Sequence, residues 1–392
     1  MTAVMLAAGC QTAPVRPRPL LTGDPILDGR AELAAAPAKD RVLWEYRIAA
    51  AALRAGDYGQ AKATLDSAIL AMGGQIASSD EAARRSRSLF RAESTKNFIG
   101  EPYERAMAYF YRGLLYWQDG EPDNARACFR SAQLIDSDAE ADSYRGDYVL
   151  LDYLDGLASA KLAGDGSDAR ARAERSAKRA LPAYDPKANV LCFVEFGRGP
   201  RKYASGQFRE QLRFAAEDSA VRSAALEVGG QTMHFSPWDD LHFQATTRGG
   251  RVMDHILGRK AVFKQNTEAV GDVALVGAAV AANNIYSPDY RHGGTASKNY
   301  DAENMAIALG VIGLFSKIAA AAATPAADTR TWDNLPQYLA FGAFHLPPGE
   351  HRATLRFFDA SGNALEYLTR NVTLAVNDPA RDTVVILSEL KR

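Results

Sequence analysis

One spacing of small and apolar residues occurs twice in the first half of the chain, and it constrains the fold more than any other feature of the sequence. In GDYGQAKATLDSAI, residues 56–69, a small-residue turn precedes Ala61, Leu65 and Ala68, whose intervals of four and three place them on one helix face. The stretch YFYRGLLYWQDGEPDNARACFRSAQLID repeats these offsets with Gly113, Tyr116, Gly120, Ala125, Phe129 and Ala132. The sequence therefore predicts consecutive helix pairs.

This register resembles the tetratricopeptide repeat, in which two helices pack through exchanges of small for large side chains. A degenerate third copy spans residues 153–180, and Ala, Leu and charged residues at helical spacing begin at Arg41. We therefore predict a helical repeat domain over residues 40–184, with an extra helix before Gly100 and with Pro102 in the first turn of the next helix. Such repeats normally present a concave surface to a peptide or protein partner.

Charged and aromatic residues at the start of the second copy are the candidate partner-binding residues. They are Glu101, Tyr103, Glu104, Arg105, Tyr109, Arg112 and Tyr116. On a concave face they would form a charged, aromatic patch of the kind that recognises a protein. Alternatively, the residues of GEPYER cap the helix and pair with Arg84, Arg85 or Arg91.

Beyond Pro186 the apolar pattern changes from helical spacing to that of strands. NVLCFVEFG, residues 189–197, is an apolar run between turn residues and predicts a buried strand. HRATLRFF, NVTLAV and TVVIL, with turns at PPG and at residues 361–363, predict antiparallel strands with one buried face. The expected fold class is α+β, with a tetratricopeptide-like α-solenoid followed by a β-rich, sandwich-like domain over residues 187–392 that contains one or two buried helices.

Two short motifs of this second half combine charged and turn-forming residues. Their candidate structural residues are Gly199, Pro200, Lys202, Asp328, Arg330 and Trp332. GRGPRKYASG has neither GxGxxG nor GxxxxGKS/T spacing, which favours a solvated turn over a phosphate-binding loop. In DTRTW we expect the aspartate and the arginine to form a salt bridge at the entry of a strand, with the tryptophan packed beneath.

The segment between these motifs contains further elements. HFQATTRGG, RVMDHIL and KAVFKQ are interpreted as strands, with a hairpin turn at Gly249 and Gly250. The Ala-rich stretches 271–282 and 304–323 are of helical type. The second is long enough for a membrane span, but Lys317 interrupts it, and burial against the sheet is favoured.

The N-terminal stretch LAAGC places Cys10 behind small residues and ahead of a Pro-rich run. It resembles the lipobox of bacterial lipoproteins, in which the cysteine becomes the acylated N-terminus. Residues 1–9 would then be the end of a signal peptide that starts further upstream, because none of them is basic. Residues 10–39 predict a flexible tether. Gln11 is not the aspartate that resembles an inner-membrane retention signal, so we expect an outer-membrane anchor facing the periplasm.

Composition excludes several classes of function. Forty-six basic and 47 acidic residues leave a net charge of −1, so no overall field favours nucleic acid. Cys10, Cys128 and Cys192 form no CxxC pair, and we expect neither a metal nor a cofactor. Cys128 and Cys192 either stay as two separately buried thiols, which is the favoured interpretation, or form a disulfide.

No catalytic residue is assigned from the sequence. MHFSPWDDLHF contains His234, Asp239, Asp240 and His242, but the histidines lack the spacing of a helical metal motif, and a polar loop is favoured over a metal site. No GxSxG elbow is present.

Three segments together resemble a family of uncharacterised bacterial outer-membrane lipoproteins with tetratricopeptide-like helices and a β-rich C-terminal part. They are KNFIGEPYERAMAYFYRGLLYWQDGEPDNARACFRSAQ, VEFGRGPRKY and DTRTWDNLPQYLAFGAFHLPPGEH. The resemblance implies a periplasm-facing lipoprotein, encoded near envelope lipoproteins that resemble activators of peptidoglycan synthases, with no agreed catalytic residues.

The leading hypothesis is a lipid-anchored envelope adaptor that binds envelope proteins or peptides through its helical repeats, in cell-wall or envelope assembly. One alternative is an envelope hydrolase acting on glycan or peptidoglycan, with a site between the two halves near residues 234–255. A clustered pair of histidines with a carboxylate would favour that enzyme. A second alternative is a structural subunit of an oligomeric outer-membrane assembly, for which we expect a large apolar patch on the β-rich face.

Overall fold

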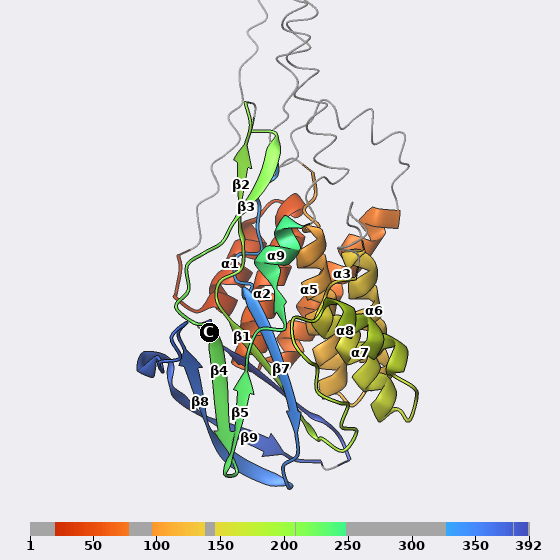
Figure 1. The fold of residues 1–392 in the computed structure, drawn as a ribbon. Coiled ribbons are helices and arrows are strands. Elements are labelled where there is room, and N and C mark those ends of the chain that lie inside the picture. Colours follow the sequence, from red (N-terminus) through yellow and green to blue (C-terminus); the bar gives the residue numbers. More distant parts are fainter. Residues whose placement is uncertain are drawn as a thin grey trace, which may run out of the picture.

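Helices come first in the chain and strands second, so the α+β class is confirmed (Figure 1). The computed structural model describes residues 20–77, 96–137, 146–207, 209–247, 327–378 and 380–390. We call residues 20–184 the helical half and residues 187–390 the β half. The extra helix is predicted before Gly100, and residues 78–95 of that stretch lie outside the described residues, as do Cys10 and the elements predicted within 248–326.

Within the described residues, the helical half contains a short N-terminal helix followed by three helix pairs. The bounds are α1 Pro25–Ala35, η1 Ala38–Asp40, α2 Arg41–Ala55, α3 Tyr58–Ala77, α5 Pro102–Gln118, α6 Pro122–Asp136, α7 Val149–Lys161 and α8 Ser167–Ser176. α2 packs on α3, α5 on α6 and α7 on α8. Pro102 begins α5, as predicted, because a proline at the first helical position removes only an N–H that has no partner in the helix.

The two sequence copies bury the faces that their spacing predicts. Fully buried residues at equivalent positions of α3 and α6 are Ala61, Leu65 and Ala68, and Ala125, Phe129 and Ala132. The helices of the second pair approach closely at Gly113, where a Cβ would lie 2.6 Å from the Phe129 ring. The turns between the helices contain Gly56 and Gly120, whose φ values of 78° and 81° favour glycine.

The tether predicted up to residue 39 is wrong over its last part, because α1 forms there and packs on α2. Asp24 accepts hydrogen bonds from the N–H groups of Ile26 and Leu27 and so caps the helix, while Pro25 is its first residue. A Cβ on Gly29 would lie 2.7 Å from Ile48 Cγ1, so α1 lies directly against α2. Pro25, one of the prolines from which a flexible run is predicted, is instead the first residue of α1.

The β half forms two four-stranded sheets and one two-stranded sheet within the described residues. The bounds are β1 Val190–Phe196, β2 Arg201–Ser205, β3 Gln211–Ala215, β4 Ser223–Val228, β5 Gln231–Phe235, β6 Asp239–Asp240, α9 Leu241–Thr246, β7 Tyr338–Phe344, β8 Gly349–Phe358, η4 Glu366–Leu368, β9 Arg370–Val376 and β10 Thr383–Ser388. The strand orders are β10-β1-β7-β6, β5-β4-β8-β9 and β2-β3.

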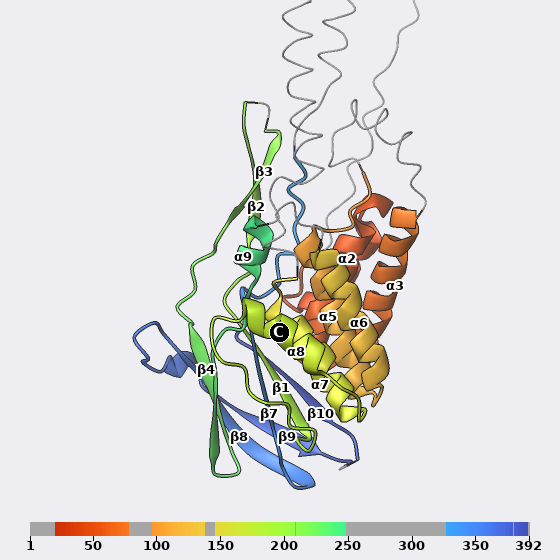
Figure 2. The same cartoon turned by 45° about the vertical axis from the view of Figure 1, so that its right-hand side comes forward.

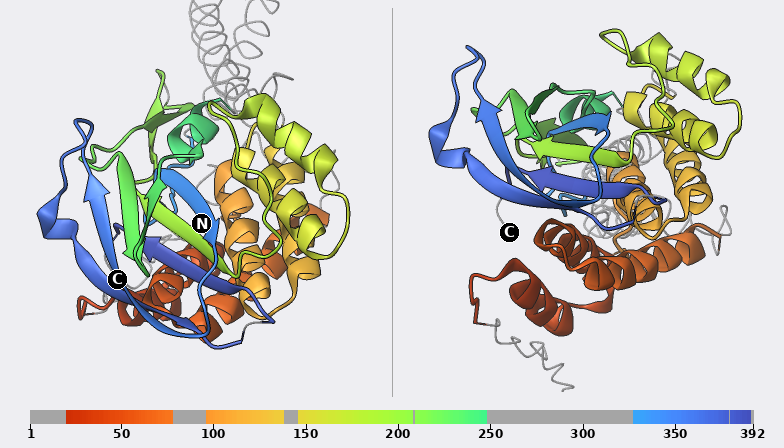
Figure 3. Two further views of the ribbon diagram at one scale, coloured as in Figure 1. Left: turned by 60° about the horizontal axis from the view of Figure 1, so that its bottom comes forward. Right: turned by 90° about the horizontal axis from the view of Figure 1, so that it is seen from below.

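β1 is buried along its whole length, as its apolar run predicts, because both of its faces are covered. Leu191 and Phe193 belong to a hydrophobic core shared with the helices. Val190, Cys192, Val194 and Phe196 belong to a second core, shared with the β5-β4-β8-β9 sheet. The molecule therefore has three layers, with the helical half on one side of the β10-β1-β7-β6 sheet and the other four-stranded sheet behind it (Figures 2 and 3).

Because the first of these cores includes residues of both halves, the predicted boundary near residue 186 does not separate two independent cores.

Two predictions for the strands are wrong. TVVIL forms β10, but it pairs in parallel with β1, whereas the other strand pairs are antiparallel within the described chain. HFQATT forms α9, because Asp240 accepts from the N–H groups of His242 and Phe243 and so caps a helix there. For β10, pairing with a distant strand outweighs the local apolar pattern. For α9, the helix cap does so.

Candidate functional site

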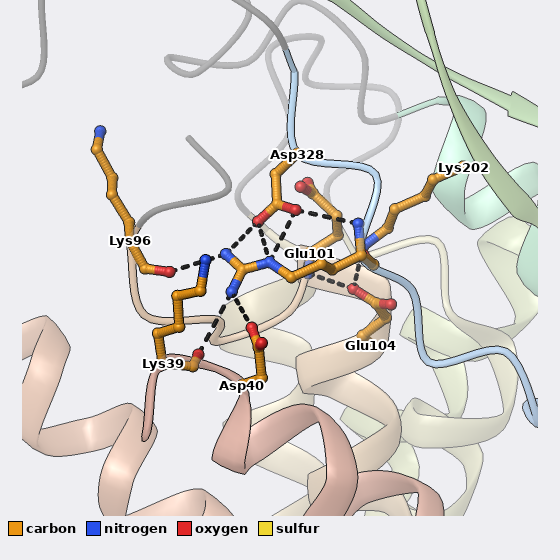
Figure 4. A network of polar contacts seen from close by, with 8 residues as sticks. Lys39, Asp40, Lys96, Glu101, Glu104, Lys202 and Asp328 are labelled. Atoms are coloured by element: carbon orange, nitrogen blue, oxygen red, sulfur yellow. Dashed lines mark hydrogen bonds and ion pairs between the residues drawn. The ribbon is translucent and has the colours of Figure 1, made fainter. Parts of the chain in front are cut away.

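Arg330 connects three segments that are far apart in the sequence, and Figure 4 shows its partners Asp40, Lys96 and Asp328. Its guanidinium donates to the Asp328 carboxylate at 2.5 and 2.9 Å, to the Asp40 carboxylate at 2.6 Å and to the Lys96 carbonyl at 2.9 Å. The salt bridge of the DTRTW motif is therefore present, and it extends to the start of α2. Charge-assisted bonds of this kind fix geometry as well as adding energy.

Glu104 forms the second part of the same network (Figure 4). Its carboxylate accepts from Lys202 Nζ at 2.5 Å, from the backbone N–H of Trp332 at 2.8 Å and from the backbone N–H of Glu101 at 2.6 Å. Lys202 Nζ also donates to the Arg330 carbonyl at 2.9 Å. We call Asp40, Glu104, Lys202, Asp328 and Arg330 the polar joint, since they connect α2, α5, β2 and the segment before β7.

Trp332 packs beneath this joint, as the sequence predicts. It is fully buried, its ring stacks on Tyr46 of α2 with centroids 4.4 Å apart, and Tyr111 of α5 meets it edge-on at 6.0 Å. Its indole N–H donates to Asn334 at 2.7 Å. One side chain of the β half is therefore enclosed by two helices of the helical half.

GRGPRKYASG is not a solvated turn throughout. Gly199 donates its N–H to the Leu335 carbonyl at 2.9 Å, and a Cβ there would lie 2.9 Å from that oxygen. Pro200 is buried, and Lys202 is buried against Glu104. The motif thus places a lysine in the interior and holds the start of β2 against the segment that follows Trp332.

A second buried charge cluster, which the sequence did not reveal, lies between α2, α5 and β1. Arg54 Nε donates to Glu195 Oε2 at 2.9 Å, and the Tyr111 hydroxyl donates to the other oxygen of the same carboxylate. Both charged side chains are almost fully buried. The available signal was Glu195 itself, because an acid inside an apolar strand run requires a buried partner.

A third cluster contains Asp239, for which the sequence favoured a polar loop. This interpretation is wrong, because Asp239 is buried and its carboxylate accepts from the N–H groups of Val149 and Leu150, at the start of α7, at 2.9 and 2.8 Å. Burial raises the pKa of Asp239 to about 8, although these two hydrogen bonds act in the opposite direction. No group of three potential metal ligands occurs in the described residues.

The inner face of the helical half is covered by the chain's own sheet. Phe110 of α5 meets Phe193 of β1 at 6.0 Å, and Tyr153 of α7 meets Phe341 of β7 at 5.8 Å. The indole N–H of Trp117 donates to Asp382, which also accepts from Lys161 Nζ, both at 2.8 Å. The prediction that this face is open to a partner is therefore wrong.

Of the predicted partner-binding residues, Tyr103 and Glu104 belong to this covered interior. Both are fully buried, and Tyr103 meets Phe214 of β3 at 5.8 Å. The alternative prediction, that residues of GEPYER cap the helix, fits Glu104 better than partner binding does, because the Glu104 carboxylate accepts from the Glu101 N–H. Its charged partner, however, is Lys202.

Glu101 is the N-cap residue of α5, and the other four predicted residues lie on the side of the helix opposite Tyr103, at helical spacing. We call Arg105, Tyr109, Arg112 and Tyr116 the outer stripe. Arg112 donates to Asp66 of α3 at 2.6 Å and stacks over the Tyr116 ring at 3.6 Å. All four are buried or half-buried, and the stripe lies beside Cys128 of α6, whose pKa burial raises to about 11.

Two leucines, one in α3 and one in α6, are exposed at equivalent positions of the two sequence copies. Leu70 of α3 is 78% exposed and Leu134 of α6 is 76% exposed. Each follows the last buried alanine of its copy, Ala68 or Ala132, by two residues. The outer face of the helical half therefore presents large apolar side chains in a regular position.

Cys128 and Cys192 are separately buried free thiols, as favoured from the sequence. Cys128 lies in α6, and Cys192 lies in β1 with its pKa raised by burial. A thiol whose pKa is raised in this way is a poor nucleophile.

Comparison with protein-family models, curated proteins and solved structures finds no match for the chain. Among the helices that the structure describes, none combines the length and the apolar character needed to cross a membrane.

Proposed function

We propose that the protein is a lipid-anchored, periplasm-facing adaptor of the bacterial outer membrane, similar to the lipoprotein family named above. It binds envelope proteins or peptides without catalysing a reaction, and its helix pairs act as tetratricopeptide-like repeats. The partner contacts the outer face of these repeats, because the inner face packs on the protein's own sheet.

The observation that carries this proposal is the repeated exposure of a leucine. An isolated exposed leucine needs no explanation, but Leu70 and Leu134 occupy the same register position in two successive helix pairs. The half-buried Tyr109 and Tyr116 and the buried Arg112 lie on the helix between them, and tyrosine and arginine are enriched where proteins bind one another. The sheet behind the helices supplies a rigid support.

Acylation of Cys10 would hold this body close to the membrane. Because residues 22–24 form a hydrogen-bonded turn against α1, the tether is shorter than the sequence suggests and comprises residues 11–19. A flexible run of that length has a root-mean-square reach of about 15–20 Å. The adaptor therefore works near the inner surface of the outer membrane.

Photo-crosslinking in living cells tests the outer face. A benzoylphenylalanine is introduced at position 70 or 134, and a control is introduced at position 367, because Tyr367 of the β half has the same 76% exposure as Leu134. We expect a discrete crosslinked protein from positions 70 and 134, identified by mass spectrometry and confirmed by the reciprocal crosslink. Equal crosslinking from all three positions would contradict a specific site.

The anchor is tested separately. Mass spectrometry of the membrane-extracted protein is expected to find Cys10 acylated at a new N-terminus, and Cys10→Ala is expected to release the protein into the soluble periplasmic fraction. A Cys10→Ala protein that remains in the membrane fraction would contradict the anchor.

A further inference from the structure

Three large apolar side chains project into solvent at the N-terminal edge of the described structure. Leu20 is 93% exposed, Leu21 is 69% exposed and Leu27 is 51% exposed. We call these residues the leucine edge. Folded proteins seldom place several such side chains together in water without a use for them.

The leucine edge is held by hydrogen bonds. The Asp28 carboxylate accepts from the backbone N–H of Thr22 at 2.6 Å, from its hydroxyl at 2.8 Å and from the backbone N–H of Gly23 at 2.9 Å. These bonds close a turn from residue 22 to α1, and Leu21 directly precedes it. Gly23 has a φ of 87°, which this turn requires and which other residues rarely adopt.

The turn is also fixed to the body of the protein. Ile26 packs against the core that the helices share with the sheet, and Gly29 lies against Ile48 of α2. Leu27 lies between them on α1 and points away from that core. The turn that follows Leu21, and Leu27 on α1, are therefore held against the body of the protein.

Its place in the chain indicates what covers it. Leu20 follows Cys10 by ten residues, a distance of no more than about 35 Å even when the chain is fully extended. Arg16 and Arg18 lie between them, and Arg30 is exposed on α1. Leucines flanked by arginines are typical of segments that lie in the interface of an anionic lipid surface.

We propose that the leucine edge inserts into the phospholipid surface that holds the acyl chains, so that this membrane, rather than a protein, covers Leu20, Leu21 and Leu27. This inference rests on the proposed anchor at Cys10. The acyl chains supply most of the membrane affinity, and the leucine edge fixes the orientation of the body because α1 is packed on α2. Insertion of the leucine edge places the α1 end of the helical half next to the lipid.

The test uses the full chain on vesicles of phosphatidylethanolamine and phosphatidylglycerol that contain a nickel-chelating lipid. A hexahistidine tag replaces residues 1–9 and Cys10→Ala removes the acylation site, so the result does not depend on acylation. Cys128 and Cys192 are buried, so Leu21→Cys supplies the accessible thiol for an environment-sensitive fluorophore. Leu134→Cys is the matched control.

On the vesicles we expect the emission at position 21 to shift to shorter wavelength and to be quenched by doxyl-labelled phospholipid, with neither effect at position 134. Emission at position 21 that stays unchanged on vesicle-bound protein would overturn the proposal. So would a shift that appears only when envelope proteins are added, because a protein would then cover the leucines.

A binding measurement provides a second readout. Without the tag, Leu20→Ser/Leu21→Ser/Leu27→Ser is expected to lower partitioning onto the same vesicles on the order of tenfold, since partly buried leucines contribute apolar area. Leu70→Ser/Leu134→Ser should leave partitioning unchanged. Equal losses in both variants would overturn a specific lipid contact, whereas failure of Cys10 acylation in cells would contradict only the anchor.

Discussion

Glu104 shows how one side chain can join the two halves. Its carboxylate lies in the interior and receives an ammonium group from β2 and two backbone N–H groups, one of them from Trp332. Burying such a pair adds little net stability, because desolvation offsets most of the attraction. Removing one partner is costly, however, since the other charge then stays buried alone.

Replacing Lys202 tests this directly. Lys202→Met is expected to lower the free energy of unfolding by about 3 kcal/mol or more, because Glu104 loses its counter-charge. Urea denaturation followed by circular dichroism measures the change. Arg201→Met, at the exposed neighbouring position, is expected to change it by less than about 0.5 kcal/mol. A double variant with Glu104→Gln should recover part of the loss, and similar values for both lysine and arginine variants would contradict the role of the pair.

Asp239 makes stability depend on pH. Its pKa is raised from 3.8 to about 8 by burial, so the folded state keeps a proton that the unfolded state has already released. The free energy of unfolding should therefore fall as the pH rises from about 4 to about 8. Asp239→Asn, which resembles the protonated acid, should reduce this fall in urea titrations across that range. An unchanged pH dependence in the variant would exclude Asp239 as its source.

At the scale of elements, the periodicity of apolar residues predicted which faces of the helices and strands are buried, because local sequence determines those faces. The buried faces of α3 and α6 and the fully buried β1 follow from the spacing of apolar residues. The parallel partner of β1 could not be predicted, because β10 reaches it from almost 200 residues further along the chain. The helix α9 could not be predicted, because an aspartate pair such as Asp239 and Asp240 is equally typical of a loop and of a helix cap.

The same dependence on distant parts of the chain explains why the predicted partner-binding residues lie in different environments. Tyr103 and Tyr109 look alike in the sequence, yet one is buried against β3 and the other lies in the outer stripe. Their difference depends on which side of α5 the sheet covers. Spacing alone does not contain that information.

Two glycines test how closely the helices of a pair approach. Gly113→Ala is expected to destabilise the protein by about 1–3 kcal/mol, because the new methyl group would lie 2.6 Å from the Phe129 ring. Gly73→Ala, in α3, meets nothing within 4 Å and should stabilise it by about 0.5–1 kcal/mol. Thermal unfolding of both variants measures the two changes, and a shift in the same direction for both would contradict the close approach.

At the scale of the whole molecule, the shared core makes the two halves one unit. Helices that form repeats usually keep one face free, but here Phe110, Tyr111 and Tyr153 use that face to bind the sheet. Separating the halves would expose an apolar surface on both. The predicted two-domain division describes the order of elements along the chain and not units that fold alone.

The two buried cysteines can show whether the two halves unfold together, because one cysteine lies in each half. In a Cys10→Ala background, Cys128 and Cys192 are expected to become reactive toward a thiol reagent at the same urea concentration. Pulse labelling followed by peptide mass spectrometry measures each site. Labelling of Cys128 at clearly lower urea than Cys192 would show that the helical half unfolds first.

The parallel pairing of β10 with β1 has a consequence for how the molecule is made. β10 is synthesised after the other described strands, yet it lies beside β1 and holds Asp382 against Trp117 and Lys161. Until it arrives, the edge of β1 stays unpaired and the helix ends next to it stay uncovered. Folding of the nascent protein must therefore wait for β10, which makes it dependent on chaperones and sensitive to C-terminal truncation.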